Sequence, residues 1–181
     1  MFLDRDGTLC EDYGPLRRFE DMAIFPYTYS ALHNVLEMGF ELVVVTNQAA
    51  IAKGLITLED VQTTSKAMVE HFRLRGIKVL DSLFCPHHPD GVVAEYSHSC
   101  GCRKPMAGML LDAAAAHDIC LAKSVMVGDN ITDIIAGQRA GCRFSLLVLT
   151  GHGHAFRTAH SGPILRSIEE LPEFLRTVAC S

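Results

Sequence analysis

The feature that most restricts the fold of this chain is an apolar run, Leu-Val-Val-Val, at residues 42–45. Apolar side chains at consecutive positions point to both faces of a strand, so both faces must be covered by other elements. Strands of this kind occur in parallel sheets that carry helices on each side. We therefore predict a strand over 41–46 and an α/β protein built on a parallel sheet.

Strand-like and helix-like segments alternate along the chain. Apolar residues at helical spacing predict helices over 30–38, 57–75, 109–117, 133–140 and 168–179. Short apolar runs predict strands at 1–3, 79–84, 124–128 and 145–149. This alternation is typical of a doubly wound parallel sheet. With 181 residues the chain is predicted to be a single domain, 1–181, large enough to bury a core.

The composition excludes several functional classes. No apolar run approaches the ~18–20 residues that a membrane span needs, and no signal peptide is visible, so a cytoplasmic protein without a membrane partner is expected. A net charge of −5 with scattered basic residues gives no footprint for nucleic acid. Seven cysteines and nine histidines without secretory features indicate a metal or free thiols rather than disulfides.

Two aspartates directly follow the first predicted strand. Asp4 lies at its end, and Asp6 lies two residues later on the loop that Gly7 allows to turn. The carboxyl ends of parallel strands face the crevice in which α/β proteins bind ligands. One carboxylate to attack and one to transfer a proton would suit phosphoryl transfer through an aspartyl-phosphate. A calcium loop or an ordinary turn explains the pair equally well when it is considered alone.

Further polar residues follow other predicted strands in an order that identifies a family. The set resembles the haloacid dehalogenase (HAD) superfamily of phosphatases over residues 1 to about 150. Asp4-Arg-Asp6-Gly-Thr-Leu matches the first motif of that superfamily, and Thr46-Asn47 the second. Lys104 matches the third motif, and Gly128-Asp129-Asn-Ile-Thr-Asp133 matches the fourth.

The resemblance implies a role for each of these residues. Asp4 would be the nucleophile, Asp6 the general acid and base, and Thr46 and Lys104 would neutralise the phosphoryl oxygens. A catalytic Mg²⁺ would be held by Asp4, the backbone carbonyl of Asp6, and Asp129. Asp133 would lie behind them, orienting Lys104 or a metal-bound water. The alternative is that these acids only cap helices or stand in solvent.

A second metal site is indicated by Cys85-Pro-His87-His88-Pro and Cys100-Gly-Cys102. Three thiols and one imidazole fit a structural tetrahedral Zn²⁺ site. Zinc-containing members of the superfamily carry the same loop before Arg-Lys-Pro, and this resemblance implies the ligands Cys85, His87, Cys100 and Cys102. The ion would fix a loop of about 18 residues, 85–102, and so place Arg103 and Lys104. The alternative is four buried or unpaired side chains.

The remaining cysteines and a late group of histidines have no ligand spacing. Cys10, Cys120, Cys142 and Cys180 are predicted to be small apolar packing residues. His152, His154 and His160 lie in a Gly- and Ser-containing segment, for which we predict a solvated loop, with a weak accessory metal site as the alternative.

The spacing between the motifs leaves no room for a separate cap domain. Selectivity must therefore come from loops, at 12–16, 48–53 and the zinc loop. Among the uncapped zinc-containing phosphatases, the resemblance is greatest to those that remove the 7-phosphate of D-glycero-D-manno-heptose 1,7-bisphosphate. It rests on residues 43–48, 85–89 and 102–111. It implies a small phosphorylated sugar as the substrate, and substrate contacts from Asp12, Asn47, Gln48, Arg103 and Asn130.

Several alternatives stay open. The alternative substrates are histidinol phosphate, or a small sugar phosphate other than the heptose bisphosphate. A nucleic-acid 3′-phosphatase and a zinc-containing binding module without catalysis are hypotheses from other classes. Ala49-Ala50, Pro15 and Asn130 depart from the common pattern and leave the preferred anomer open. A monomer is expected.

Overall fold

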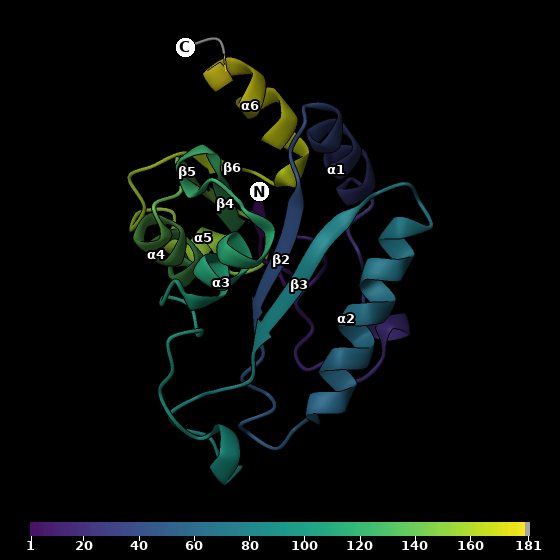
Figure 1. Cartoon of the computed structure of the whole chain (residues 1–181), viewed down its shortest axis with the longest axis vertical. Coiled ribbons are helices and arrows are strands. Elements are labelled where there is room, and N and C mark those ends of the chain that lie inside the picture. Colours follow the sequence, from purple (N-terminus) through teal and green to yellow (C-terminus); the bar gives the residue numbers. More distant parts are fainter. Residues whose placement is uncertain (180–181) are drawn as a thin grey trace.

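The computed structural model describes residues 1–179 and contains a six-stranded parallel sheet (Figure 1). The order is β3-β2-β1-β4-β5-β6, so the short first strand lies at the centre. The strands are β1 Phe2–Leu3, β2 Leu42–Asn47, β3 Val79–Cys85, β4 Val125–Gly128, β5 Phe144–Val148 and β6 Ile164–Leu165. The predicted doubly wound parallel sheet is confirmed.

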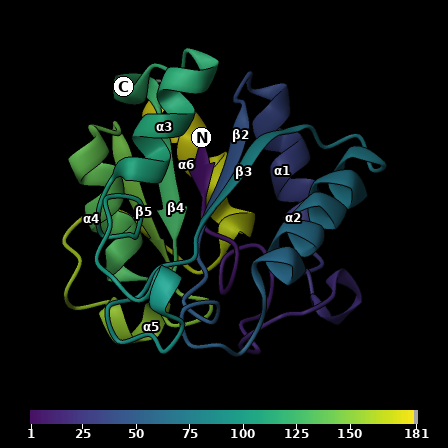
Figure 2. The ribbon, with the colours of Figure 1, turned by 60° about the horizontal axis from the view of Figure 1, so that its bottom comes forward.

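Helices cover both faces of the sheet (Figure 2). One face carries α1 (Thr28–Glu37), α2 (Leu58–Arg73) and α6 (Leu171–Ala179), and the other carries α3 (Gly108–His117) and α4 (Ile131–Ala140). Successive strand residues point to opposite faces. In β2, Val44 joins the core under α1 and α2, while Val43 and Val45 join the core under α3 and α4. The apolar run at 42–45 is therefore buried from both sides, as predicted.

Helix ends follow local capping chemistry. Thr57 and Asp60 form the capping box that begins α2, with Asp60 N donating to Thr57 Oγ1 at 3.0 Å and Thr57 N to Asp60 Oδ2 at 2.8 Å. Gly141 ends α4 in the left-handed conformation, φ 84°. These boundaries lie within two residues of the predicted ones.

Two predictions about the C-terminal third need correction. The segment after β5 was predicted to be loop, but it contains the short helix α5 (Gly153–Phe156). It also contains a sixth strand, β6, which pairs with β5. The helix predicted at 168–179 begins as a 3₁₀ turn, Ile168–Glu170, and becomes α6 only at Leu171. Pro172 explains the change, since it has no N–H to donate to the carbonyl of Ile168 and is tolerated only in the first turn of a helix.

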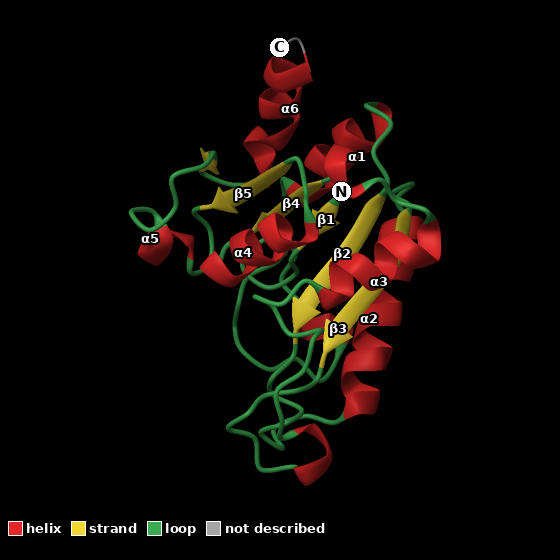
Figure 3. Ribbon diagram, turned by 60° about the vertical axis from the view of Figure 1, so that its left-hand side comes forward, coloured by secondary structure: helices red, strands yellow, loops and turns green. Residues whose placement is uncertain are grey.

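Residues 1–179 form no separate cap domain over the carboxyl ends of the strands. Between β1 and β2 they form a short 3₁₀ turn (Phe19–Asp21) and α1, and between β2 and α3 they form α2, β3 and a loop with one 3₁₀ turn, Ala94–Tyr96. Figure 3 shows that the chain beyond the tips of β2 and β3 is almost entirely loop. Within residues 1–179, none of the helices combines the length and apolar character of a membrane span.

Candidate active site and cysteine cluster

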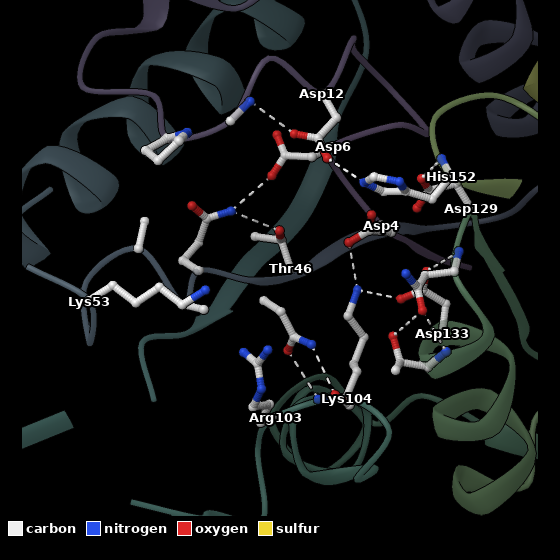
Figure 4. A pocket seen from close by; sticks show the side chains of 18 of the residues that line it. Asp4, Asp6, Asp12, Thr46, Lys53, Arg103, Lys104, Asp129, Asp133 and His152 are labelled. Carbon is white, nitrogen blue, oxygen red and sulfur yellow. Dashed lines mark hydrogen bonds and ion pairs between the residues drawn. The ribbon is translucent and has the colours of Figure 1, made fainter. Parts of the chain in front are cut away.

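A pocket of about 550 Å³ opens at the carboxyl ends of the central strands (Figure 4). The chain brings together in it all the predicted residues of the carboxylate site and its surroundings. They are Asp4, Asp6, Asp12, Thr46, Asn47, Gln48, Arg103, Lys104, Asp129, Asn130 and Asp133. Their gathering follows from the parallel sheet, in which every strand ends at the same edge.

The pairing of β1 with β4 places the first and fourth motifs side by side. Asp4 N donates to Val127 O at 2.9 Å, so Asp4 and Asp129 leave adjacent strands at the same level. The backbones of Gly7 and Gly151 pack closely against the Asp129 carboxylate. A Cβ on either glycine would lie 2.2 Å from Asp129 Oδ2, and both have positive φ values, 77° and 53°. Only glycine fits these two positions.

Lys104 is the centre of a buried ion-pair network. Its Nζ lies 2.5 Å from Asp4 Oδ1, 2.6 Å from Asp133 Oδ1 and 2.7 Å from Val45 O. Burial acts against the charged amine, but Asp133 and Asp4 together raise the pKa of Lys104. Burial also raises the pKa of Asp4 well above its usual value, and Lys104 opposes this shift. The network therefore holds the carboxylate of the predicted nucleophile, Asp4, in direct contact with the predicted phosphate-binding amine of Lys104.

Asp133 performs two structural tasks. Its Oδ1 contacts Lys104, and its Oδ2 accepts from Asn130 N at 3.0 Å as part of the capping box that begins α4. Both oxygens are therefore engaged. Asn130 in turn caps the helix through Oδ1, which accepts from Thr132 N at 3.1 Å.

Asp129 has one oxygen held and one available. His152 N donates to Oδ2 at 2.7 Å, whereas Oδ1 has no hydrogen bond from any of residues 1–179. Burial raises the pKa of Asp129 to about 6. In Asp4, similarly, Oδ1 contacts Lys104 and Oδ2 accepts no hydrogen bond within the described chain. Two carboxylate oxygens of adjacent strands are thus left for another ligand.

The charges of this pocket fit a divalent cation. When all groups are ionised, four carboxylates at the inner end of the pocket meet two buried cations, which leaves a local excess of two negative charges. The groups are Asp4, Asp6, Asp129 and Asp133 against Arg5 and Lys104. One oxygen each of Asp4, Asp129 and Asp133 lies within 4.8 Å of the other two. An all-oxygen donor set suits a hard ion such as Mg²⁺.

Two predicted substrate contacts have protein partners. The Asn47 amide pairs with the backbone of Lys104, donating to its O and accepting from its N, both at 3.0 Å. Gln48, 5% exposed, donates to Asp6 Oδ2 at 2.9 Å and to Thr46 Oγ1 at 3.0 Å. Both residues line the pocket and also position its other members. Their contacts to a substrate stay a prediction.

Asp12 and Arg103 lie at different sides of the pocket (Figure 4). Asp12 Oδ2 lies 3.1 Å from the exposed ring of His152. The Arg103 guanidinium extends toward the cavity, and its Nη1 donates to His87 O at 3.2 Å.

The predicted zinc ligands form a cluster of their own beside the pocket. The three sulfur atoms of Cys85, Cys100 and Cys102 lie 3.2–3.4 Å apart, and His87 Nδ1 lies 3.7 Å from Cys85 Sγ and 3.5 Å from Cys102 Sγ. None of the three cysteines forms a disulfide. Tetrahedral Zn²⁺ with Zn–S distances of about 2.3 Å needs ligands close to this spacing. His88 is outside the cluster, as predicted.

The predictions for the other cysteines and for the histidines at 152–160 are only partly confirmed. Cys10 is buried and Cys142 packs against the core, but Cys120 is exposed, so the prediction of a packing role is wrong there. Cys180 lies outside the described residues. His160 is buried against Pro163 O at 3.2 Å, which contradicts a solvated loop at that position. Within residues 1–179 none of the three histidines joins a metal-binding group.

Three residues around the pocket were missed by the sequence analysis. His152 reaches Asp129 through its backbone, so its side-chain type gives no signal. Lys53, inside the predicted loop 48–53, points into the cavity from the same side as Arg103 (Figure 4). Arg5 pairs with Asp6, and its position between the two aspartates was the available signal.

Comparisons with known proteins agree with this geometry. Residues 101–171 match a family model described as "HAD-hyrolase-like". A D-glycero-beta-D-manno-heptose-1,7-bisphosphate 7-phosphatase from Yersinia pestis is 40% identical over 177 residues, which cover 97% of this chain and 94% of the relative. A D-glycero-alpha-D-manno-heptose-1,7-bisphosphate 7-phosphatase from Photorhabdus laumondii is 38% identical and covers 83% of this chain and 82% of the relative.

A solved structure is also similar along the whole chain. The D,D-heptose 1,7-bisphosphate phosphatase from B. bronchiseptica, complexed with magnesium and phosphate, has a TM-score of 0.84 and 28% identity. It covers 98% of this chain and 97% of its own. Fold, site and sequence agree, and the chain belongs to the heptose-1,7-bisphosphate 7-phosphatase family of HAD-like hydrolases.

Proposed function

We propose that this protein hydrolyses the 7-phosphate of D-glycero-D-manno-heptose 1,7-bisphosphate, with Asp4 as the nucleophile. The relatives from Yersinia pestis and Photorhabdus laumondii bear the names of enzymes with this activity. A substrate with two phosphates needs two anion-binding regions in one pocket. The arrangement of charges in this pocket supports such a substrate.

The observation that carries the proposal is the way in which Arg103 is held. Its backbone follows Cys102, and its guanidinium donates to the carbonyl of His87 at 3.2 Å. Arg103 is thus attached to the cysteine cluster at two points and faces the cavity opposite the carboxylates (Figure 4). A planar guanidinium in a fixed position is suited to a second phosphate group.

In the proposed reaction Asp4 attacks phosphorus and forms an aspartyl-phosphate. Thr46 Oγ1 and Lys104 Nζ, both buried beside Asp4, would stabilise the equatorial oxygens of the phosphoryl group. Asp6 would protonate the sugar oxygen as it leaves and then take a proton from the water that hydrolyses the intermediate.

Two metal ions complete the proposal. Asp4 and Asp129, each with one available carboxylate oxygen, and the backbone carbonyl of Asp6 would hold Mg²⁺. When bound, the ion supplies charge that offsets repulsion between the nucleophile and the phosphate. Cys85, His87, Cys100 and Cys102 would hold Zn²⁺ and keep Arg103 in place.

The test is to compare Arg103→Ala with the wild type on matched substrates in Mg²⁺. Each charge-assisted hydrogen bond to the distal phosphate contributes roughly 1.5–3 kcal/mol. We therefore expect kcat/KM for the 1,7-bisphosphate to fall about 100-fold or more, at about 1.4 kcal/mol per decade. The heptose 7-phosphate, without a distal phosphate, should change less than about threefold by the same conversion.

Both anomers of the bisphosphate and histidinol phosphate belong in the same panel. Arg143→Ala is the control, because Arg143 is exposed and lies outside the pocket. Equal losses on the bisphosphate and the monophosphate would mean that Arg103 contacts the transferred phosphoryl group. A wild type with higher kcat/KM for histidinol phosphate would reject the heptose assignment.

A further inference from the structure

Arg5 is a buried cation placed between the two aspartates of the first motif. Only 2% of its side chain is exposed. Its Nε donates to Asp6 Oδ1 at 2.9 Å, and its Nη2 donates to Asp6 Oδ2 at 2.7 Å. A charge removed from water to this extent needs an ionic partner to remain favourable. The partner that Arg5 has is the predicted general acid and base.

Asp6 is held by further donors on each oxygen. Gln48 Nε2 donates to Oδ2 at 2.9 Å, and Cys10 Sγ lies 3.7 Å from Oδ1. About 20% of the Asp6 side chain stays exposed to the pocket. Arg5 therefore lies on the protein side of the carboxylate, and the opposite side faces the cavity in which a substrate would bind.

The site contains two separate ion-pair systems. Lys104 holds Asp4 and Asp133, and no ion pair within residues 1–179 joins Lys104 to Asp6. Arg5 holds Asp6, and its only ion pair in the described part of the chain is this one. The nucleophile and the proton-transfer group are thus oriented by different cations, so substitution can address them independently.

We propose that Arg5 is a positioning residue for proton transfer by Asp6. This inference rests on the proposed function, in which Asp6 is the acid and base. A guanidinium that meets a carboxylate with two parallel N–H···O bonds fixes the plane of the carboxylate as well as its distance. The exposed part of the Asp6 carboxylate then faces the cavity, where the leaving oxygen and later the attacking water must be.

The proton balance of the two steps gives the proposal a specific signature. In the first step the P–O bond to the sugar breaks, Asp4 binds phosphorus, and Asp6 gives its proton to the leaving alkoxide oxygen. In the second step water attacks phosphorus, Asp6 recovers a proton from that water, and Asp4 is released. A nitrophenolate leaving group needs no proton in the first step, but its phosphoenzyme needs Asp6 in the second.

The experiment compares Arg5→Met and Arg5→Lys with the wild type by rapid-quench kinetics. With the sugar bisphosphate, Arg5→Met should slow the first step about 100-fold, within the range of about 10²–10⁴ for positioned general acid catalysis. With p-nitrophenyl phosphate the first step should change less than about threefold, and hydrolysis should slow. The variant should therefore release a burst of one nitrophenolate per enzyme and accumulate phosphoenzyme.

Two further variants separate positioning from a structural role. Arg5→Lys keeps the charge without the two-pronged geometry. It should show an intermediate loss in the first step with the sugar substrate alone, and an intermediate slowing of hydrolysis with both substrates. In an Asp6→Asn background, Arg5→Met should cause no further loss, because both changes remove the same function. Arg18→Met is the matched control, since Arg18 also forms a two-pronged pair, with Asp21, on the exposed surface.

The outcomes that overturn the inference are distinct from failure of the proposed function. Equal losses on the sugar phosphate and p-nitrophenyl phosphate, without a burst, would mean that Arg5 only supports the fold. So would a full additional loss in the Asp6→Asn background. If Arg5→Met does not fold, the same comparison is made with Arg5→Lys. Whether the wild type turns over the heptose bisphosphate at all tests the proposed function, and glycerol phosphate then replaces it as the alkyl substrate.

Discussion

The carboxylate pocket and the cysteine cluster are assembled in opposite ways. Asp4 and Asp129 extend from neighbouring buried strands, β1 and β4, and their positions follow from the pairing of those strands. Three members of the cysteine cluster lie on one irregular loop, and the fourth, Cys85, is the last residue of β3. We infer that the sheet preorganises the first site, and we predict that the second site would need a bound metal to fix its loop.

The largest expected effect tests the preorganised site. Asp4→Asn keeps the shape of the side chain but removes the attacking charge and one oxygen ligand of Mg²⁺. Activity should fall by at least about 10³-fold, as when a covalent catalyst is deleted. Because the sheet holds the site, the thermal midpoint should stay near that of the wild type. Retention of a tenth of wild-type turnover would exclude the aspartyl-phosphate mechanism.

The next effect tests the loop-borne site. Cys100→Ser should lower zinc, measured by elemental analysis after gel filtration, from about one ion per chain in the wild type. Zinc present at about 100 times its Kd stabilises the folded chain by about 2.7 kcal/mol. Its loss should therefore lower the thermal midpoint of unfolding by roughly 5–10 °C. Activity on the bisphosphate should decrease about 10-fold or more, because Arg103 is released.

The matched control is Cys120→Ser, since Cys120 is exposed and outside the cluster. It should change neither zinc content, nor stability, nor rate. A preparation of the wild type with full activity and no tightly bound zinc would contradict the difference drawn between the two sites.

The smallest effect concerns pH and Mg²⁺ at the carboxylate pocket. Burial raises the pKa of Asp129 to about 6, so the metal-free site takes up a proton as the pH falls through that value. Magnesium needs ionised carboxylates at both Asp129 and Asp4, and its affinity should fall at least about 10-fold for each pH unit below about 6. Calorimetric titrations at pH 5, 6, 7 and 8 measure this, and a flat profile would contradict it.

The raised pKa of Asp129 has the opposite effect on the stability of the metal-free chain, which should decrease as the pH rises. The folded state binds the Asp129 proton more tightly than the unfolded state does. This contribution is fully present below the unfolded pKa, near 4, and is lost as the pH rises through about 6. Midpoints recorded in a chelator that spares zinc should therefore decrease over this interval, and Mg²⁺ should remove the decrease.

Much of the fold could be predicted because its signals are local. Burial on both faces is visible in the run at 42–45, and the capping box at Thr57 marks the start of α2. The sixth strand was missed because two residues, Ile164–Leu165, are too short to show a period and gain their place only by pairing with β5. Tertiary pairing of this kind leaves no trace in sequence.

The sequence predicted which residues form the site better than it predicted the contacts between them. Motif order brought eleven residues to one pocket, but it could not show that Asn47 pairs with the backbone of Lys104 or that Gln48 joins Asp6 to Thr46. Those contacts depend on side-chain geometry between separate loops. Arg5 was missed because the first motif was interpreted through its two acids alone.

The double engagement of Asp133 has a consequence for local opening of the structure. Its two oxygens cap the first turn of α4 and hold Lys104, so that turn cannot unwind without also releasing the amine. Local unfolding usually begins at helix ends, where the free-energy cost is low. Here the cost includes breaking a buried ion pair, which should give the hydrogen-bonded amides of Thr132 and Asp133 the slow hydrogen exchange that is typical of a helix interior.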